Sequence, residues 1–496
     1  MQAMTSSPAI GVSFCRQRRW LSPFVWLAAG LFATAALAQP ATPPATATTE
    51  SSATEPAAAA PSGTGPATTG ATAAAEAAPA DAGVAEPPPA QTAAPAETAA
   101  PAETVAAETA VSAVTANEQL VASTEQQFGE NSLPTAEAYF DLAEAQRQVR
   151  EYEAAAKSYL SAIEIYRAID GAFTPLAINA LTSLGDNYHE SGDNLSAVSA
   201  YTEARTVSRR VYGLLSERQI ALLDRMSRSL LDLNQSAEAD EQQIEALRLV
   251  ERNYPPESDQ VLAAIYKYAG WLRDRGQFQL ERDQYARALR IIREYYGKES
   301  VRQVEPLVGI GNSFRNQRIP DGQGIGALQD ALTLLLAAPE HDPLSTAVVL
   351  RDLGDWAVAF NKVGYDGAEY RRAWQLLGEV ANGEQLRSEW FTGPAYVLRE
   401  PISLRGLSEE QDAPQGHVLV SFDLDRTGQS GNVAVVESVP PGLKDEAVLR
   451  HIRRSRFRPQ MAGGELINAS ALALQFNFRY SLDAVAAAEQ AEEPQR

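Results

Sequence analysis

A register of 42 residues runs through the middle of this 496-residue chain and restricts its fold more than any other feature. Apolar residues that are each followed by Ala, Gly or Ser recur at intervals of 42, 42, 42, 42 and 43 residues: Leu142, Leu184, Met226, Tyr268, Ile310 and Leu353. A fixed period of this length is the signature of stacked copies of one supersecondary unit. The register therefore predicts a repeat array, which the helical character of the sequence extends over residues 117–382.

Each repeat has the spacing of two amphipathic helices joined by a turn. In the second repeat, large residues three and four positions apart define a buried face on each helix, and small residues let the two backbones approach closely. This set is Leu181, Leu184, Gly185 and Tyr188, then Gly192 at the turn, then Ala197, Tyr201 and Ala204. The fifth repeat departs most, because Pro320 and three glycines interrupt it, so we expect its second helix to begin late, near Ala327.

This pattern resembles the tetratricopeptide repeat in a 42-residue form. The resemblance implies a mainly α fold, a right-handed solenoid of about six helix pairs whose first helices line a concave groove that binds protein segments. The polar residues assigned to that groove are Asn179, Asp186, His189, Arg273, Asn312 and Arg315, with Arg351 and Asp355 in the sixth repeat. For any one of them, a solvated helix face is an equally good interpretation.

The chain changes pattern after residue 382. Residues 417–425 alternate between apolar and polar, 432–439 are rich in valine, 444–455 have helical spacing, and 472–480 alternate again. Alternation with period two indicates half-buried strands, and the three- and four-residue spacing indicates a helix. The order strand, strand, helix, strand predicts a small α+β unit within residues 383–482, with one sheet and one covering helix.

The run Val-Ser-Phe-Asp-Leu-Asp-x-x-Gly beginning at Val420, followed by a Val-rich strand, a short helix and Arg456-Phe457-Arg458-Pro459, resembles the TonB C-terminal domain. The resemblance implies that residues 396–404 run along the domain. It also implies that a segment of an outer-membrane receptor adds as a strand to the edge of the sheet. The closing strand, residues 467–480, is the candidate edge, and the residues assigned to it are Leu472, Leu474, Phe476, Asn477 and Phe478.

Five arginines gather on and just after the predicted helix, in a chain whose formal net charge is −21. They are Arg450, Arg453, Arg454, Arg456 and Arg458. One interpretation pairs them with the acidic repeat region or with solvent. The other assigns Arg450 and Arg454 to the docking of an acidic segment of a partner.

The first 38 residues have the parts of a secretory signal: basic residues, an apolar run from Trp20, and Ala36-Leu37-Ala38 before Gln39. Cleavage at this site predicts a periplasmic protein. A retained inner-membrane anchor is the alternative, because an apolar run of about 18 residues is marginal for a membrane span. Residues 39–116 are rich in Ala, Pro and Thr and are expected to be a disordered linker, and 483–496 a disordered tail.

The sequence contains no motif for a catalytic nucleophile, a phosphate-binding loop or a zinc protease, so we expect no enzyme and no cofactor. The four histidines are widely separated and the single cysteine, Cys15, precedes the apolar run, so no metal site is expected. The acidic net charge argues against nucleic acid as a partner.

Two functions fit these features. The first is a periplasmic adaptor that binds partner peptides through its repeat groove and through strand addition to its C-terminal unit. The alternative is a TonB-type energy transducer for transport driven through an outer-membrane receptor. The apolar run lacks the histidine that the anchor of that family usually carries, which favours the adaptor, whereas the proline-containing linker favours the transducer.

Overall fold

The computed structural model of the protein describes residues 10–13, 102–340, 342–403, 407–408, 413–483 and 485. Most of the expected signal segment, the linker up to residue 101 and most of the expected tail lie outside the described residues. No helix within the described part is both long and apolar enough to cross a membrane. The apolar run from Trp20 to Ala38 is not in that part, so the choice between signal and anchor stays a prediction.

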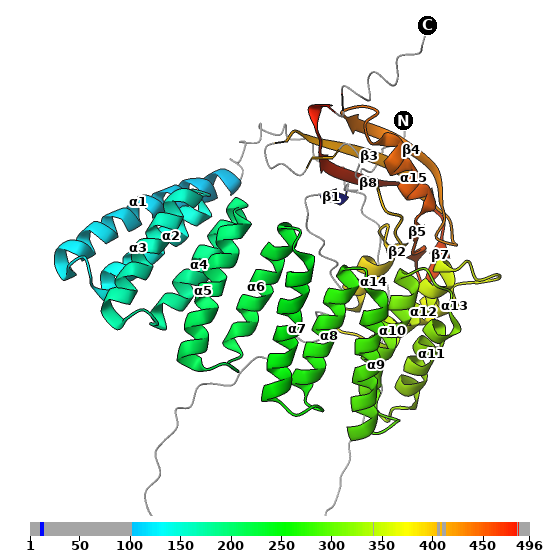
Figure 1. The fold of residues 1–496 in the computed structure, drawn as a ribbon. Helices are drawn as coiled ribbons and strands as arrows, with labels where there is room; N and C mark the ends of the chain where they lie inside the picture. Colours follow the sequence, from blue (N-terminus) through cyan, green and yellow to red (C-terminus); the bar gives the residue numbers. More distant parts are fainter. Residues whose placement is uncertain are drawn as a thin grey trace, which may run out of the picture. The chain divides into compact units, whose positions relative to one another are not determined.

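Helices follow one another in six pairs through the repeat region, as the register predicts (Figure 1). The pairs are α2 (Leu133–Gln148) with α3 (Tyr152–Asp170), α4 (Leu176–Ser191) with α5 (Asn194–Tyr212), α6 (Arg218–Asp232) with α7 (Ser236–Asn253), α8 (Asp259–Asp274) with α9 (Phe278–Tyr295), α10 (Val304–Asn316) with α11 (Gly322–Ala337), and α12 (Pro343–Ala359) with α13 (Ala368–Leu377). The mainly α repeat fold is thereby confirmed.

The second pair shows why these sequences form hairpins of helices. Gly192 ends α4 with a left-handed backbone, φ 87°, and the side chain of Asp193 then caps α5 by accepting a hydrogen bond from the backbone N–H of Ser196. Where the two helices cross, the ring of Tyr201, which is 1% exposed, packs directly on Gly185. A side chain at residue 185 would have to occupy the space of that ring.

We expect Gly185→Ala to lower the free energy of unfolding by about 1–3 kcal/mol, the usual cost of overpacking a core. A Cβ atom at residue 185 would lie 2.4 Å from Cε1 of Tyr201. The matched control is Gly326→Ala in α11, where nothing lies within 4 Å and the higher helix propensity of alanine should stabilise the protein slightly. Urea unfolding of both variants measures the difference, and equal midpoints would contradict the packing argument.

Two expected boundaries move. The second helix of the fifth repeat begins at Gly322 rather than near Ala327, because the carboxylate of Asp321 accepts the N–H of Gln323 at 2.6 Å and caps the helix there. Helix α1 (Ala102–Phe128) begins inside the segment 39–116 that we expected to be disordered. Its apolar residues Val114 and Val121 are buried against Leu142 of α2, so α1 covers the outer side of the first pair.

The C-terminal unit has the predicted order of two strands, a helix and a strand. β3 (Gln415–Leu424) pairs antiparallel with β4 (Ser430–Val439) on one side and with β8 (Ala469–Arg479) on the other. Helix α15 (Asp445–Arg454) covers one face with Val448 and Ile452, which pack against the buried side chains of β3 and β8. A fourth strand, β1 (Ile10–Ser13), pairs parallel with β8, so that the sheet order is β1, β8, β3, β4.

The segment between the repeats and the sheet packs on the C-terminal unit, as expected for residues 396–404. β2 (Tyr396–Leu398) pairs antiparallel with β5 (Arg456–Phe457), and the ring of Tyr396 lies 4.6 Å from that of Phe457. Residues 404–406 are outside the described part. Three further elements complete the unit: α14 (Gly383–Phe391), β6 (Gln460–Ala462) and β7 (Glu465–Ile467), which pairs with β6.

Candidate functional site

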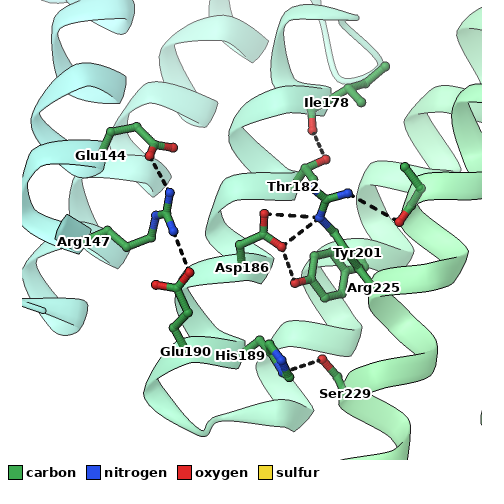
Figure 2. Close-up of polar contacts among 11 residues, drawn as sticks. Glu144, Arg147, Ile178, Thr182, Asp186, His189, Glu190, Tyr201, Arg225 and Ser229 are labelled. Atoms are coloured by element: carbon green, nitrogen blue, oxygen red, sulfur yellow. Dashed lines mark hydrogen bonds and ion pairs between the residues drawn. The ribbon is translucent and has the colours of Figure 1, made fainter. Parts of the chain in front are cut away.

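Polar side chains of successive repeats bond to one another across the boundary between α4 and α6 (Figure 2). The carboxylate of Asp186 on α4 accepts hydrogen bonds from Nε of Arg225 on α6, at 2.9 and 3.2 Å. The hydroxyl of Tyr201 on α5 donates to the same carboxylate at 2.7 Å. Burial and the bond to Asp186 raise the pKa of Tyr201, so its hydroxyl stays a hydrogen-bond donor over the neutral range.

The neighbouring polar residues make similar contacts. Arg147 on α2 bonds Glu144 at 2.7 Å and reaches Glu190 on α4 at 2.6 Å. Nδ1 of His189 lies 2.8 Å from Oδ1 of Asn194 and 3.2 Å from Oγ of Ser229 on α6. Asp186 and His189, which the sequence assigned to a partner, are thus engaged within the chain.

The same holds at the other end of the array. Asn312 on α10 donates to Asp352 on α12 at 2.9 Å, and Arg315 donates to Asp355 at 3.1 Å. Arg273 lies 3.8 Å from Asp274, whereas Asn179 is exposed on α4. Asp186, His189, Asn312 and Arg315 therefore connect successive repeats. Partner binding by these residues stays a prediction, and of the six Asn179 is the one whose side chain has no described polar contact.

Arg351, which we expected to face the groove, is only 4% exposed. Its guanidinium bonds Oδ1 of Asp352 at 3.0 and 2.8 Å and lies over the ring of Trp390, 4.5 Å from the centroid. Trp390 belongs to α14, which follows the last pair. The arginine is therefore enclosed where the repeat array meets the segment that leads to the C-terminal unit.

The C-terminal unit is joined to the last repeat by a largely enclosed ion pair, in which the side chain of Arg458 is 11% exposed. Nε and Nη2 of Arg458 each donate to one oxygen of Asp355 at 2.8 Å, across 103 residues of sequence. Asp355 is 1% exposed and also accepts from the hydroxyl of Tyr370 at 2.8 Å. Burial alone would raise the pKa of Asp355, but the charges of Arg458, Arg315 and Arg351 outweigh it and hold that pKa below its usual range.

This ion pair reproduces the contact between the second and third repeats. In both places a Leu-Gly-Asp run is followed 15 residues after the aspartate by a tyrosine whose hydroxyl bonds that aspartate. Both tyrosine rings pack on the glycine of the run, Gly185 or Gly354. Arg225 of the next repeat completes the first site, and Arg458 of the C-terminal unit completes the second. Arg458 therefore takes the place of an arginine from a following repeat.

Sequence reasoning grouped Arg458 with the other arginines and did not find this role. The shared Leu-Gly-Asp and tyrosine pattern of the second and sixth repeats was the available signal, because it predicts that Asp355, like Asp186, needs an arginine from whatever comes next. The contact surface continues at Gly367, which packs on Leu466 of β7, and at Arg318, whose Nη2 lies 3.0 Å from Glu400.

Three of the four remaining arginines lie on the exposed side of α15, whereas Arg456 is half-buried in β5. Arg450, Arg453 and Arg454 are exposed, and Arg454 lies 3.7 Å from Glu400. No described residue pairs with Arg450. Together with residues 400–403, Arg450 and Arg454 border a recess of about 280 Å³. His451 at its base is buried and bonds Tyr396, and burial lowers its pKa to about 4, so the positive charge of the recess comes from the arginines.

The closing strand β8 presents its predicted apolar residues to the core. Leu474, Phe476 and Phe478 are buried and Leu472 is partly buried in the cluster under α15, whereas Asn477 points to the other face, where its Oδ1 accepts from Gln475 at 2.7 Å. The outer edge of β8 is paired with β1, where Asn477 lies opposite Ser13. These apolar side chains are thus not free to contact a partner, and any strand added at this edge would bond the backbone.

No group of three His, Cys, Asp or Glu side chains in the described ranges is arranged to hold a metal ion. The polar sites above consist of arginine, carboxylate and tyrosine groups that bond one another. These contacts join successive repeats to one another and the last repeat to the C-terminal unit.

The fold and these contacts define a repeat protein of the tetratricopeptide type that carries a C-terminal sheet unit. The family described as "Gram-negative bacterial TonB protein C-terminal" matches residues 409–482. This match and the sheet topology identify the unit as a TonB C-terminal domain. None of the curated proteins compared with the chain matches it.

Solved structures of helical repeat proteins are similar to the chain. Nearly identical TPR-like repeats of a kinesin light chain from Podosopora anserina share 16% identity, with a TM-score of 0.33, over 38% of this chain and 89% of that one. BtubC from P. vanneervenii shares 18% identity, with a TM-score of 0.31, over 53% and 99%. The C-terminal part of a TPR repeat-containing protein from Cytophaga hutchinsonii shares 10%, with a TM-score of 0.32, over 55% and 95%. Similarity this low carries no information on partners.

Proposed function

We propose that the protein is a periplasmic adaptor that holds one partner segment along its repeat array and a second at the edge of its C-terminal sheet. The observation that carries the proposal is the buried Arg458–Asp355 pair, which fixes a TonB C-terminal domain to the last repeat instead of leaving it on a flexible tether. Two binding surfaces held in one body suit an adaptor that sets the distance between two partners.

The edge of β8 is the proposed site of strand addition. An extended segment of the chain, Ile10–Ser13, already pairs with β8 over residues 474–477, and this pairing supports the proposed role. Cleavage after Ala38 would remove that segment and leave the backbone N–H and C=O groups of β8 free to pair with a partner. The exposed Arg450 and Arg454 near the recess would then attract acidic residues that flank the added strand.

Site-specific crosslinking tests the edge. A cysteine at Asn477 on β8, carrying a photo-crosslinker, is expected to form adducts with outer-membrane proteins in cells. The matched control is Val436→Cys on β4, which is 61% exposed at the opposite side of the same sheet and should give none. Equal labelling from both positions, or no adduct from Asn477, would refute strand addition at β8.

The alternative is a TonB-type energy transducer, which the family match at residues 409–482 favours. The two functions differ in the fate of the N-terminus. A mature protein that begins at Gln39 and fractionates away from the membrane is the result expected for the adaptor. An intact N-terminus in the inner-membrane fraction would instead support the transducer.

A further inference from the structure

The polar contact that joins the second and third repeats is missing between the fourth and fifth. In the 42-residue register, Asp186 corresponds to Gly270 on α8, and Arg225 corresponds to Gly309 on α10. Both members of the Asp186–Arg225 pair are thus replaced by glycine. At Gly270 an added Cβ would meet only the flexible end of Arg273, at 3.4 Å.

Tyr285 lacks its usual acceptor as a result. It stands 15 residues after Gly270, the same separation as in Asp186–Tyr201 and Asp355–Tyr370. Its ring packs on Gly309, where an added Cβ would lie 2.4 Å from Cζ, and the residue is only 6% exposed. Among the described residues, none forms a hydrogen bond with its hydroxyl. The hydroxyl oxygen itself is not closed off from solvent, so a group of a ligand can reach it.

A second tyrosine and a carboxylate lie beside it. The rings of Tyr266 on α8 and Tyr285 have centroids 6.2 Å apart and an angle of 37° between their planes. Besides burial, the negative charge of Glu305 raises the pKa of both tyrosines, which shows that this carboxylate is close to both rings. Glu305 is exposed in the first turn of α10, at the register position that Asn179 has in the second repeat.

The ionisable groups around this cluster are mainly carboxyl groups. Glu281, Glu305 and Asp274 act on Tyr285, and Arg273 opposes them. Arg302, whose charge acts on Tyr266, is already paired with Asp259 and lies over the ring of Tyr296, 4.5 Å from its centroid. No described cation pairs with Glu305. The cluster thus offers the unpaired carboxyl group of Glu305, whose pKa is raised to about 7 by burial, together with two aromatic rings and a hydroxyl.

We propose that Tyr266, Tyr285 and Glu305 bind a lysine or arginine side chain of an extended partner segment. A cation placed there would pair with Glu305, contact the faces of the two rings and bond the hydroxyl of Tyr285. The bound cation would supply a positive charge between the fourth and fifth repeats, as Arg225 does between the second and third. The proposal names the ligand class of the repeat surface and so rests on the proposed function.

Titration of the full chain with a single amino-acid derivative tests the site. The protein is labelled with 3-fluorotyrosine, and the two resonances are assigned from Tyr266→Phe and Tyr285→Phe. We expect N-acetyl-lysine methylamide to shift both resonances and N-acetyl-glutamine methylamide to shift neither. Glu305→Gln should weaken the lysine affinity about tenfold, the range of an ion pair supported by cation–π contact. Gly270→Leu, which fills the neighbouring space without charge, should weaken it as well.

The matched control is Glu164→Gln, which removes one exposed carboxylate from α3 and should leave the lysine affinity unchanged. Equal responses to the two probes, or no response to lysine, would overturn the site. A Glu305→Gln variant that keeps its affinity and loses stability would show that Glu305 only stabilises the start of α10, and would also overturn it. Because the probe is a single residue, these outcomes are independent of the crosslinking from Asn477.

Discussion

Arg458→Ala is expected to lower the free energy of unfolding by about 3 kcal/mol, because it leaves the carboxylate of Asp355 buried with part of its charge uncompensated. Asp355 keeps its bonds to Arg315 and Tyr370, so the loss should fall short of a fully orphaned charge. Urea unfolding followed by tryptophan fluorescence measures this change. Trp390 is a suitable reporter, since its carbonyl accepts from Nη1 of Arg458 at 3.2 Å.

The matched control is Arg453→Ala, a neighbouring arginine that is exposed on α15. Surface substitutions of this kind usually change stability by less than about 0.5 kcal/mol. Hydrogen exchange should localise the effect of Arg458→Ala to α12, α13 and the C-terminal sheet, while α2 to α5 keep their protection. Equal effects of the two alanine variants would show that the buried pair does not hold the C-terminal unit on the array.

A double-mutant cycle separates the pair from its surroundings. Asp355→Asn keeps an acceptor for Tyr370 but leaves Arg458 buried without its counter-charge, so this single change should also destabilise the protein. The combination of Asp355→Asn with Arg458→Ala should cost clearly less than the sum of the two single changes. Additive costs would mean that the two residues act on stability independently.

Glu281→Gln is expected to raise the free energy of unfolding above pH 7 by up to about 3 kcal/mol. Glu281 on α9 is 1% exposed, its Oε2 has no hydrogen-bond partner, and burial raises its pKa to about 7 despite Ser313 and the charges of Arg273 and Arg282. The folded state therefore keeps the proton to a higher pH than the unfolded chain, whose carboxyl titrates near 4.5. Stability should fall as pH rises from about 4.5 to 7, and the uncharged glutamine should remove that fall.

Urea unfolding of the parent and of the variant at several pH values gives the difference directly. The two curves should meet below about pH 4, where Glu281 is protonated in both the folded and the unfolded state, and separate as pH rises. Glu164→Gln, an exposed carboxylate on α3, serves as the control and should follow the parent at every pH. A constant offset between parent and Glu281→Gln, without pH dependence, would contradict the raised pKa.

The sequence alone was sufficient for the repeat fold and the sheet unit. The helix pairs follow from a period that places Leu184 and Tyr201 on buried faces and a glycine where the two helices cross. The sheet follows from the alternation of apolar and polar residues in β3 and β8. Both are local patterns, because a helix or strand buries one face according to residues close in the chain. The period does not define where a helix begins, because a single capping residue such as Asp321 sets its start.

Only the tertiary structure decided what the polar residues do. Asp186 and His189 look like groove residues in the sequence, yet they bond across the repeat boundary. Arg458 looks like one of five surface arginines, yet it is largely enclosed and paired with Asp355. Such pairs join residues about 40 to 103 positions apart, and any acidic residue could in principle meet any arginine. The period of the chain determines which faces are buried, whereas the partner of a charged side chain depends on which helices and strands come together in space.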